Sequence, residues 1–195
     1  LINSVGSQIA GFLDFQAAMD IFPRLISESF GYHHIGLFTL DKGSNALVMC
    51  SKAGEYAGHF PPGHRIQLGE GIVGSVGMSG EMKLVNQVYD DPLYIPTLIP
   101  TQSELSLPIR VAGEVVGVLD VQSPQPNAFT DEDIKVLGTL VDQMAVVIEN
   151  ARLYEAVQKE LAERKRLEGE RQVLIYALGV RVKELTALHH ATRLF

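Results

Sequence analysis

Two acidic residues and two polar neighbours lie in a pair of short apolar segments in the second half of the chain. Glu104 and Ser106 are two residues apart in the first segment, and Asp120 and Gln122 are two residues apart in the second. If both segments are strands, each pair of side chains points to one face of the sheet. Two carboxylates facing one cavity would attract an amine or another cation, because a buried charge is costly without a partner. The alternative is that Glu104 and Asp120 are salt-bridged groups at the surface or at a sheet edge.

A second group of candidate ligand-binding residues lies in segments that could cover this sheet face. The segment from Ile72 to Met78 can form about two helical turns, and the Tyr89–Tyr94 segment is rich in turn residues. The candidates from these two segments are Ile72, Val73, Val76, Tyr89, Asp90 and Tyr94. Turn chemistry alone would also account for Asp90, Asp91 and Pro92.

The remaining pattern predicts the elements that position these residues. Apolar periodicity predicts a helix from Phe15 to Phe30, which Pro23 should kink or break. Short β-rich runs predict strands at His33–Leu40, Ala46–Ala53, Met82–Asn86, Glu104–Val111 and Val115–Gln122. The stretch from Gly54 to Leu68 is expected to be a loop or a poorly regular strand.

The last segment predicts a long helix that begins after Thr130, an N-cap followed by acidic residues. Its apolar residues recur in steps of three and four, and the stripe continues with a break in phase. We assign it to a dimeric coiled coil through Ile134, Leu137, Val141, Met144, Ile148, Leu153 and Val157. The alternatives are a loose linker or a helix folded back on its own domain.

Composition limits the class of protein. The chain has 195 residues and a formal net charge of −7, which gives no basic footprint for nucleic acid. The single cysteine, Cys50, excludes an internal disulfide and suits a reducing cytoplasm. No apolar run approaches the roughly 20 residues that a membrane-spanning helix needs.

Four segments together carry a family resemblance. Gly69–Gly74 reads G-E-G-I-V-G, Leu107–Ile109 and Gly117–Val121 read as paired strands, and Phe129–Asp133 precedes the last helix. In this combination the chain resembles a GAF domain over about Phe15 to Tyr154. The resemblance implies an α/β (α+β) fold with a central antiparallel sheet of five to six strands and helices on both sides, followed by the coiled-coil helix. The expected boundaries are a connecting helix at 1–13, the GAF domain at 14–154 and a signalling helix at 155–195.

The resemblance also implies a function. GAF domains hold a ligand between one sheet face and the short helices and loops over it. The tail from Val182 to Arg193 resembles the lead-in to a further module in bacterial sensor proteins. This implies a covalently linked output domain of the histidine kinase or cyclase type, and a homodimer through the flanking helices.

A narrower resemblance is to the free methionine sulfoxide reductases. It rests on Ser103-Glu104 with Pro108 and on Gly117 to Asp120, and it implies that the two carboxylates hold an amino-acid ligand. Reductase chemistry needs a thiolate and a resolving thiol, but only Cys50 is present. We therefore expect the pocket without the activity.

Other cofactors find little support in the sequence. A bilin would need a cysteine near the pocket loops, and His59 or His64 could ligate a haem but more simply are exposed loop residues. No metal site is expected, because the neighbours His33 and His34 point to opposite faces of a strand. The Phe129 segment does not match the cyclic-nucleotide pattern. The expected function is a small-molecule sensor, and the alternatives are a dimerisation scaffold without a ligand or a reductase.

Overall fold

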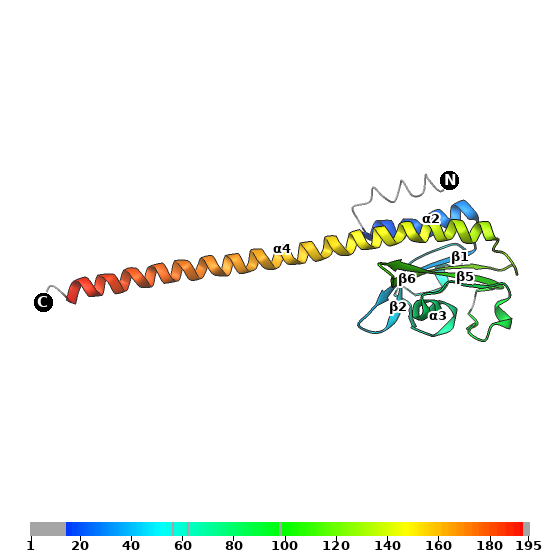
Figure 1. The fold of residues 1–195 in the computed structure, drawn as a ribbon, viewed down its shortest axis with the longest axis horizontal. Coiled ribbons are helices and arrows are strands. Elements are labelled where there is room, and N and C mark those ends of the chain that lie inside the picture. Colours follow the sequence, from blue (N-terminus) through cyan, green and yellow to red (C-terminus); the bar gives the residue numbers. More distant parts are fainter. Residues whose placement is uncertain (1–14, 56, 62, 98, 193–195) are drawn as a thin grey trace. The chain divides into compact units, whose positions relative to one another are not determined.

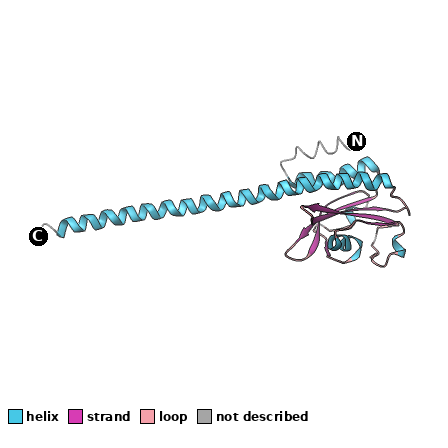
Figure 2. Ribbon diagram, viewed as in Figure 1, coloured by secondary structure: helices cyan, strands magenta, loops and turns pink. Residues whose placement is uncertain are grey.

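A six-stranded antiparallel sheet forms the centre of the domain. The computed structural model describes residues 15–55, 57–61, 63–97 and 99–192. The strands are β1 (His34–Asp41), β2 (Ala46–Ala53), β3 (Arg65–Gln67), β4 (Lys83–Val85), β5 (Ser103–Val111) and β6 (Glu114–Ser123). Their order in the sheet is β3-β2-β1-β6-β5-β4, so β1 and β6 are the central pair. The expected antiparallel sheet is confirmed, and Figure 2 shows it between helical layers.

A tight turn joins the two strands of the β5–β6 hairpin. Ala112 and Gly113 connect β5 to β6 with φ of 50° and 86°. Two consecutive positive φ values are what a type I′ turn requires, and its twist matches that of the strands it joins. This turn fixes the register in which Ser106 faces Asp120 and Glu104 faces Gln122.

One face of the sheet is covered by α2 (Phe15–Phe30) and by the first part of α4 (Asp131–Thr192), as Figure 1 shows. Pro23 lies inside α2, which continues through it, so of the expected kink or break the break is wrong. A proline removes one backbone hydrogen bond, whereas the buried Met19, Phe22 and Ile26 hold α2 against the sheet. The connecting helix expected at 1–13 lies outside the described residues.

The same core corrects part of the predicted dimer helix. Leu137, Val141, Met144 and Ile148 are at most 4% exposed and pack against α2 and the sheet, and Ile134 packs at the edge of this cluster. Burial in the domain's own core leaves these side chains unavailable to a second chain. This part of α4 therefore follows the alternative of a helix folded back on its own domain.

The other face of the sheet is covered by short elements. These are α3 (Gly71–Ser79), the 3-10 turns η1 (Ala57–His59) and η2 (Val88–Asp90), and the loops around them. A Cβ atom at Gly74 would lie 2.3 Å from the carbonyl oxygen of Gln67, and one at Gly77 would lie 2.7 Å from Leu47. The absence of a side chain at Gly74 and Gly77 allows α3 to lie close to β2 and β3 and to cover this face.

A reciprocal cap fixes the start of α4. The Asp133 carboxylate accepts hydrogen bonds from the backbone N–H and the hydroxyl of Thr130, and the Asp133 N–H donates to the Thr130 hydroxyl. The Tyr32 hydroxyl also donates to Asp133, at 2.9 Å. The cap therefore joins α4 to the segment that leads into β1.

Asp133→Ala is expected to destabilise the domain by about 2 kcal/mol, because it removes an N-terminal cap and leaves a half-buried hydroxyl without its acceptor. Urea denaturation measures the change. Asp131→Ala removes an acidic residue from the same helical turn and should change stability by less than about 0.5 kcal/mol. Equal losses in the two variants would contradict this role of the cap.

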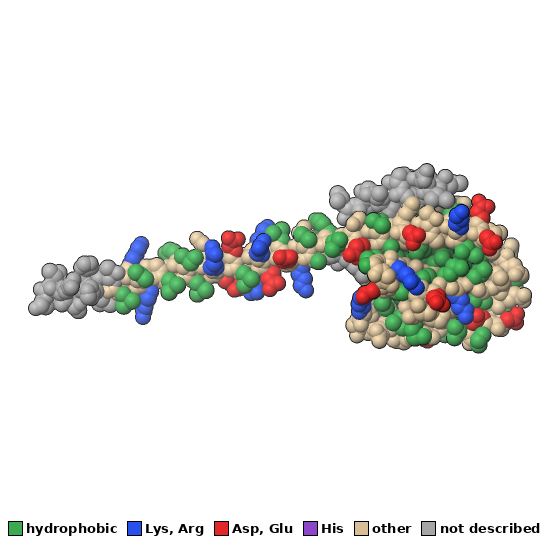
Figure 3. Space-filling view, viewed as in Figure 1, with side chains coloured by type: hydrophobic (Ala, Val, Ile, Leu, Met, Phe, Trp, Pro, Cys, Tyr) green, Lys and Arg blue, Asp and Glu red, His purple; other side chains and the backbone are tan. Residues whose placement is uncertain are grey.

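The chain divides after Ala151, and its second unit begins at Arg152. The described part of this unit is α4 alone, and its large apolar side chains are exposed, Leu153 by 55% and Val157 by 59% among them. Figure 3 shows apolar and charged side chains alternating along it. None of the described helices contains a stretch apolar enough and long enough to cross a membrane.

Candidate ligand-binding site

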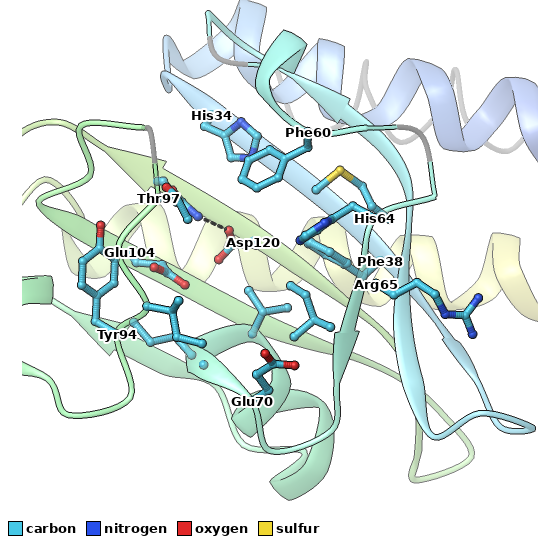
Figure 4. Close-up of a pocket in the computed structure, with 17 residues that line it drawn as sticks. His34, Phe38, Phe60, His64, Arg65, Glu70, Tyr94, Thr97, Glu104 and Asp120 are labelled. Atoms are coloured by element: carbon cyan, nitrogen blue, oxygen red, sulfur yellow. Dashed lines mark hydrogen bonds between the residues drawn. The ribbon is translucent and has the colours of Figure 1, made fainter.

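A cavity of about 210 Å³ lies on the sheet face beneath α3. Its floor comes from β1, β6 and β5, and its walls come from β2, β3, the start of α3 and the loop that contains Tyr94 (Figure 4). Most of the lining is apolar, from Phe38, Met49, Phe60, Ile66, Ile72, Val73 and Ile95. Polar side chains also line the cavity, and those on its floor, His34, Glu104, Asp120 and Gln122, can orient a ligand.

Strand register places the polar groups of the floor in two rows. His34 on β1 lies beside Gln122 on β6, which lies beside Glu104 on β5. In the next row, Gly36 lies beside Asp120, and Asp120 lies beside Ser106. Adjacent strands are about 4.8 Å apart. The acidic groups thus occupy one side of the floor and His34 occupies the other.

The two carboxylates are buried. Glu104 is 4% exposed and Asp120 is 2% exposed. The Ser106 hydroxyl donates to Asp120 at 2.6 Å, and the Gln122 amide nitrogen donates to it at 2.7 Å. The Thr101 hydroxyl in turn donates to the Gln122 carbonyl oxygen at 2.6 Å, which fixes the orientation of that amide.

No described cation neutralises the pair. None of the ion pairs within the described ranges includes Glu104 or Asp120. Arg65 also lines the cavity, but it pairs with Asp41 and points away from the acidic groups in Figure 4. The alternative of salt-bridged carboxylates at the surface is therefore wrong.

Burial controls the protonation of this pair. It raises the pKa of Glu104 well above its ordinary value, and the neighbouring Asp120 raises that pKa further. Burial also raises the pKa of Asp120, against the opposing effect of its hydrogen bonds from Ser106 and Gln122. Two adjacent desolvated carboxylates retain a proton between them, because both cannot be charged at low cost. A bound ammonium group would supply the missing positive charge.

His34 is the third buried polar group of the floor. It is 1% exposed, and its Nδ1 atom has no hydrogen-bond partner among the described residues. Its ring lies 5.3 Å from the ring of Phe60. Burial, together with smaller effects of the nearby Lys52 and His59, lowers the pKa of His34 to about 4. The imidazole is therefore neutral near pH 7.

The structure brings together six of the ten predicted ligand-binding residues. Those that line the cavity are Ile72, Val73, Tyr94, Glu104, Asp120 and Gln122. Ser106 lies beneath Asp120 as its hydrogen-bond donor, and Val76 packs in the apolar cluster behind the wall. Tyr89 and Asp90 are exposed and lie outside the lining, because η2 turns them to solvent. Tyr89 contacts the site only through its ring, 5.4 Å from that of Tyr94.

Sequence reasoning missed the contribution of β1 and β2. His34, Phe38 and Met49 line the cavity, although the strands that carry them were expected. Alternation along β1 would have grouped His34 with Phe38. Only the pairing of β1 with β6 shows that this group lies beside the carboxylates.

Cys50 lies on the other side of the sheet. It packs at the edge of the core formed by α2 and α4, and its thiol donates to the Leu37 carbonyl oxygen. Burial raises the pKa of Cys50 to about 12, which suppresses the thiolate. Its strand neighbour Met49 faces the cavity instead. Within the described ranges, no group of three or more His, Cys, Asp or Glu side chains could hold a metal ion.

This arrangement of sheet, roof and cavity corresponds to a known family. Residues 13–149 match the family model of the GAF domain. The chain belongs to the GAF domain family. Bacillus subtilis protein YtsP is 38% identical over 80 residues, which are 41% of this chain and 49% of that protein. Dictyostelium discoideum GAF domain-containing protein A is 29% identical over 72% of this chain and 81% of its own length.

Regulatory proteins and reductases both occur among the similar proteins. The Nif-specific regulatory protein of Herbaspirillum seropedicae is 29% identical over 71% of this chain, which spans only 26% of that protein. The free methionine-R-sulfoxide reductase of Neisseria meningitidis, solved with its substrate, is 25% identical with a TM-score of 0.71 over 78% of this chain and 89% of that one. The GAF domain of an Acinetobacter phosphoenolpyruvate-protein phosphotransferase is 25% identical with a TM-score of 0.70 over 78% and 92%.

Proposed function

We propose that this GAF domain is a sensor of a small amine and that it transmits ligand occupancy through α4. The observation that carries the proposal is the buried pair of Glu104 and Asp120, which lines an open cavity and forms no ion pair with any described residue. Two desolvated carboxylates are costly to the unliganded fold, and a bound ammonium group would offset that cost.

The size and lining of the cavity define the ligand class. A volume of about 210 Å³ is below the roughly 300–1,000 Å³ of pockets that hold drug-sized ligands. The apolar walls suit an aliphatic or thioether body. An amino acid or a simple biogenic amine fits both requirements, and an anionic nucleotide fits neither.

Similarity to the Nif-specific regulatory protein and to the phosphotransferase GAF domain supports a regulatory role. Similarity to the reductases supports a site for an amino-acid-like ligand. The position of Cys50, partly buried on the face opposite the cavity, argues against reductase chemistry in this chain. A scaffold without a ligand is the remaining alternative, and a cavity filled with side chains would have favoured it.

Isothermal titration calorimetry tests the proposal directly. The whole chain is titrated with the twenty proteinogenic L-amino acids, with alkylamines of three to six carbons and with adenine and guanine nucleotides. We expect saturable binding by at least one amine and none by the nucleotides. Absence of binding across the amines would leave the scaffold as the better explanation.

The second unit of α4 suggests how occupancy is transmitted. From Val146, positions in steps of four and three hold Leu153, Val157, Leu167, Leu174, Leu178 and Leu185, and the other positions of this register hold Asn150, Glu160, Arg164, Arg171 and Arg181. Val146 follows the core residue Met144 by two positions, or about 200° around the helix. α4 therefore has a core face and a separate exposed apolar face. We propose that this exposed face pairs with a second copy and leads to a linked output domain. A ligand can shift such a helix pair only as far as it prefers one arrangement.

Leu174→Lys is expected to convert a dimer into a monomer at micromolar concentration, because it buries a charge in the proposed seam. Light scattering after size-exclusion chromatography measures the mass. Tyr176→Lys places the same charge two positions away, on the outer face of the proposed pair, and should leave the dimer intact. Wild-type protein that is monomeric at 100 μM would refute the pairing.

A further inference from the structure

The floor of the cavity holds a polar group that the two carboxylates do not use. His34 is 1% exposed and lines the cavity, and no residue in the described ranges forms a hydrogen bond with its Nδ1 atom. A buried polar atom without a partner is unfavourable, and such atoms are rare in folded proteins. At a cavity wall, a ligand that supplies the partner would relieve this cost.

Among the described residues, none supplies a hydrogen-bond partner to the Nδ1 atom of His34. Its neighbour across β6, Gln122, is already committed, since it donates to Asp120 and accepts from Thr101. Phe60 contacts the imidazole ring with its own ring and offers no side-chain hydrogen bond. The Lys52 ammonium group donates to the Phe60 carbonyl oxygen. The Gln122 amide and the Lys52 ammonium group are therefore engaged elsewhere.

We propose that His34 Nδ1 is the second polar contact of the bound amine, and that it selects ligands carrying a hydrogen-bonding group in addition to the ammonium. This inference rests on the proposed function. His34 and Glu104 lie on strands separated only by β6, so their backbones are about 10 Å apart. Side chains reaching inward from both sides bracket a molecule of amino-acid size.

The neutral imidazole can serve either kind of polar group. One of its two nitrogens carries a proton and the other accepts one. A ligand carboxylate would take a hydrogen bond from the protonated nitrogen, and a ligand hydroxyl or amide could donate to the other. Of these, the carboxylate of an amino acid forms the strongest bond, because it is charged. The expected ligand is therefore an amino acid in preference to the amine that lacks its carboxyl group.

The test compares each amino acid that binds with its decarboxylated amine, by calorimetry on the whole chain. We expect wild-type protein to bind the amino acid about 10- to 100-fold more tightly than the amine. This is the difference in affinity expected for one hydrogen bond to a charged group. His34→Phe replaces the imidazole with an aromatic ring that has no nitrogen atoms. This variant should lose the preference for the amino acid and still bind the amine. A structural defect would instead weaken both ligands equally, and that result would overturn the proposal.

Two further variants locate the contact on the ring. An asparagine amide lies close to the place of Nδ1, and a glutamine amide reaches the place of Nε2. His34→Asn should therefore restore part of the preference, whereas His34→Gln should not. Restoration by glutamine alone would contradict the assignment to Nδ1.

The outcomes separate this inference from the proposed function. If wild-type protein binds neither amino acids nor amines, the proposed function fails. If it binds both with equal affinity, and His34→Phe changes neither, the amine site stands and the role of His34 is refuted. Thermal unfolding of each variant without ligand confirms that it is folded before it is titrated.

Discussion

Replacing Glu104 with alanine is expected to weaken amine binding by about 100-fold or more. Removing one partner of a buried charge pair costs about 3–5 kcal/mol, and each 1.4 kcal/mol is a factor of ten in affinity. Glu104 is 4% exposed, and the polar side chains beside it on the sheet are those of Asp120, Ser106 and its cross-strand partner Gln122. Calorimetric titration with the tightest amine from the panel measures the loss.

Asp90→Asn provides the matched control for this variant. Asp90 also carries a carboxylate, but it lies on η2, is exposed and does not line the cavity. Its removal changes the net charge by the same amount, so long-range electrostatics are matched. Affinity should stay within twofold of wild type. A similar loss in both variants would mean that overall charge, and not the buried pair, attracts the amine.

The second large effect is on the pH dependence of stability. The pKa of Glu104 is raised above its unfolded value near 4.5, so the folded state holds a proton that the unfolded state has released. The contribution of this group to stability is complete below pH 4.5 and is lost as pH rises toward the folded pKa. Within that window the slope reaches at most about 1.4 kcal/mol per pH unit.

Glu104→Gln removes this titration while keeping a side chain of the same size. Chemical denaturation of unliganded protein at pH 5, 6, 7 and 8 should show the variant gaining stability relative to wild type as pH rises. The difference between the two proteins isolates Glu104 from His34. The pKa of His34 is lowered to about 4, so its contribution is lost in the opposite direction, as pH falls below 6.5. Parallel pH profiles would show that Glu104 is ionised in the folded state and would contradict the shared proton.

These expectations share one physical origin. Glu104 and Asp120 occupy the two strands at and beside the centre of the sheet, where an aliphatic pair would make the unliganded domain more stable. Functional sites commonly keep groups that reduce stability until a ligand binds. The alkyl-lined cavity around the pair strengthens each electrostatic contact by excluding water.

Local signals in the sequence predicted most of the elements. The helix Phe15–Phe30 and the strand Ala46–Ala53 lie where the pattern placed them, because apolar periodicity and flanking glycine or turn residues act within a few residues. The same alternation on β5 and β6 placed Glu104, Ser106, Asp120 and Gln122 on one face. The short connection at Ala112 and Gly113 was enough to pair these two strands.

Such local signals do not predict which segments pair when those segments are far apart in the sequence. That β1 lies beside β6 brings His34 next to Gln122, and no local pattern specifies that neighbour. The burial of Leu137 and Met144 likewise depends on α2 and the sheet lying beneath them. A stripe in steps of three and four looks the same whether it faces a partner chain or its own core.

The sequence by itself therefore determined which residues could share a face, the family resemblance and the acidic character of the site. The tertiary structure alone decided that the carboxylates are buried without a described cation, that His34 completes the floor and that the first part of α4 is a core helix. The physical reason is that periodicity fixes the direction of a side chain relative to its own backbone. Burial and partnership depend on which other segments the chain brings against it.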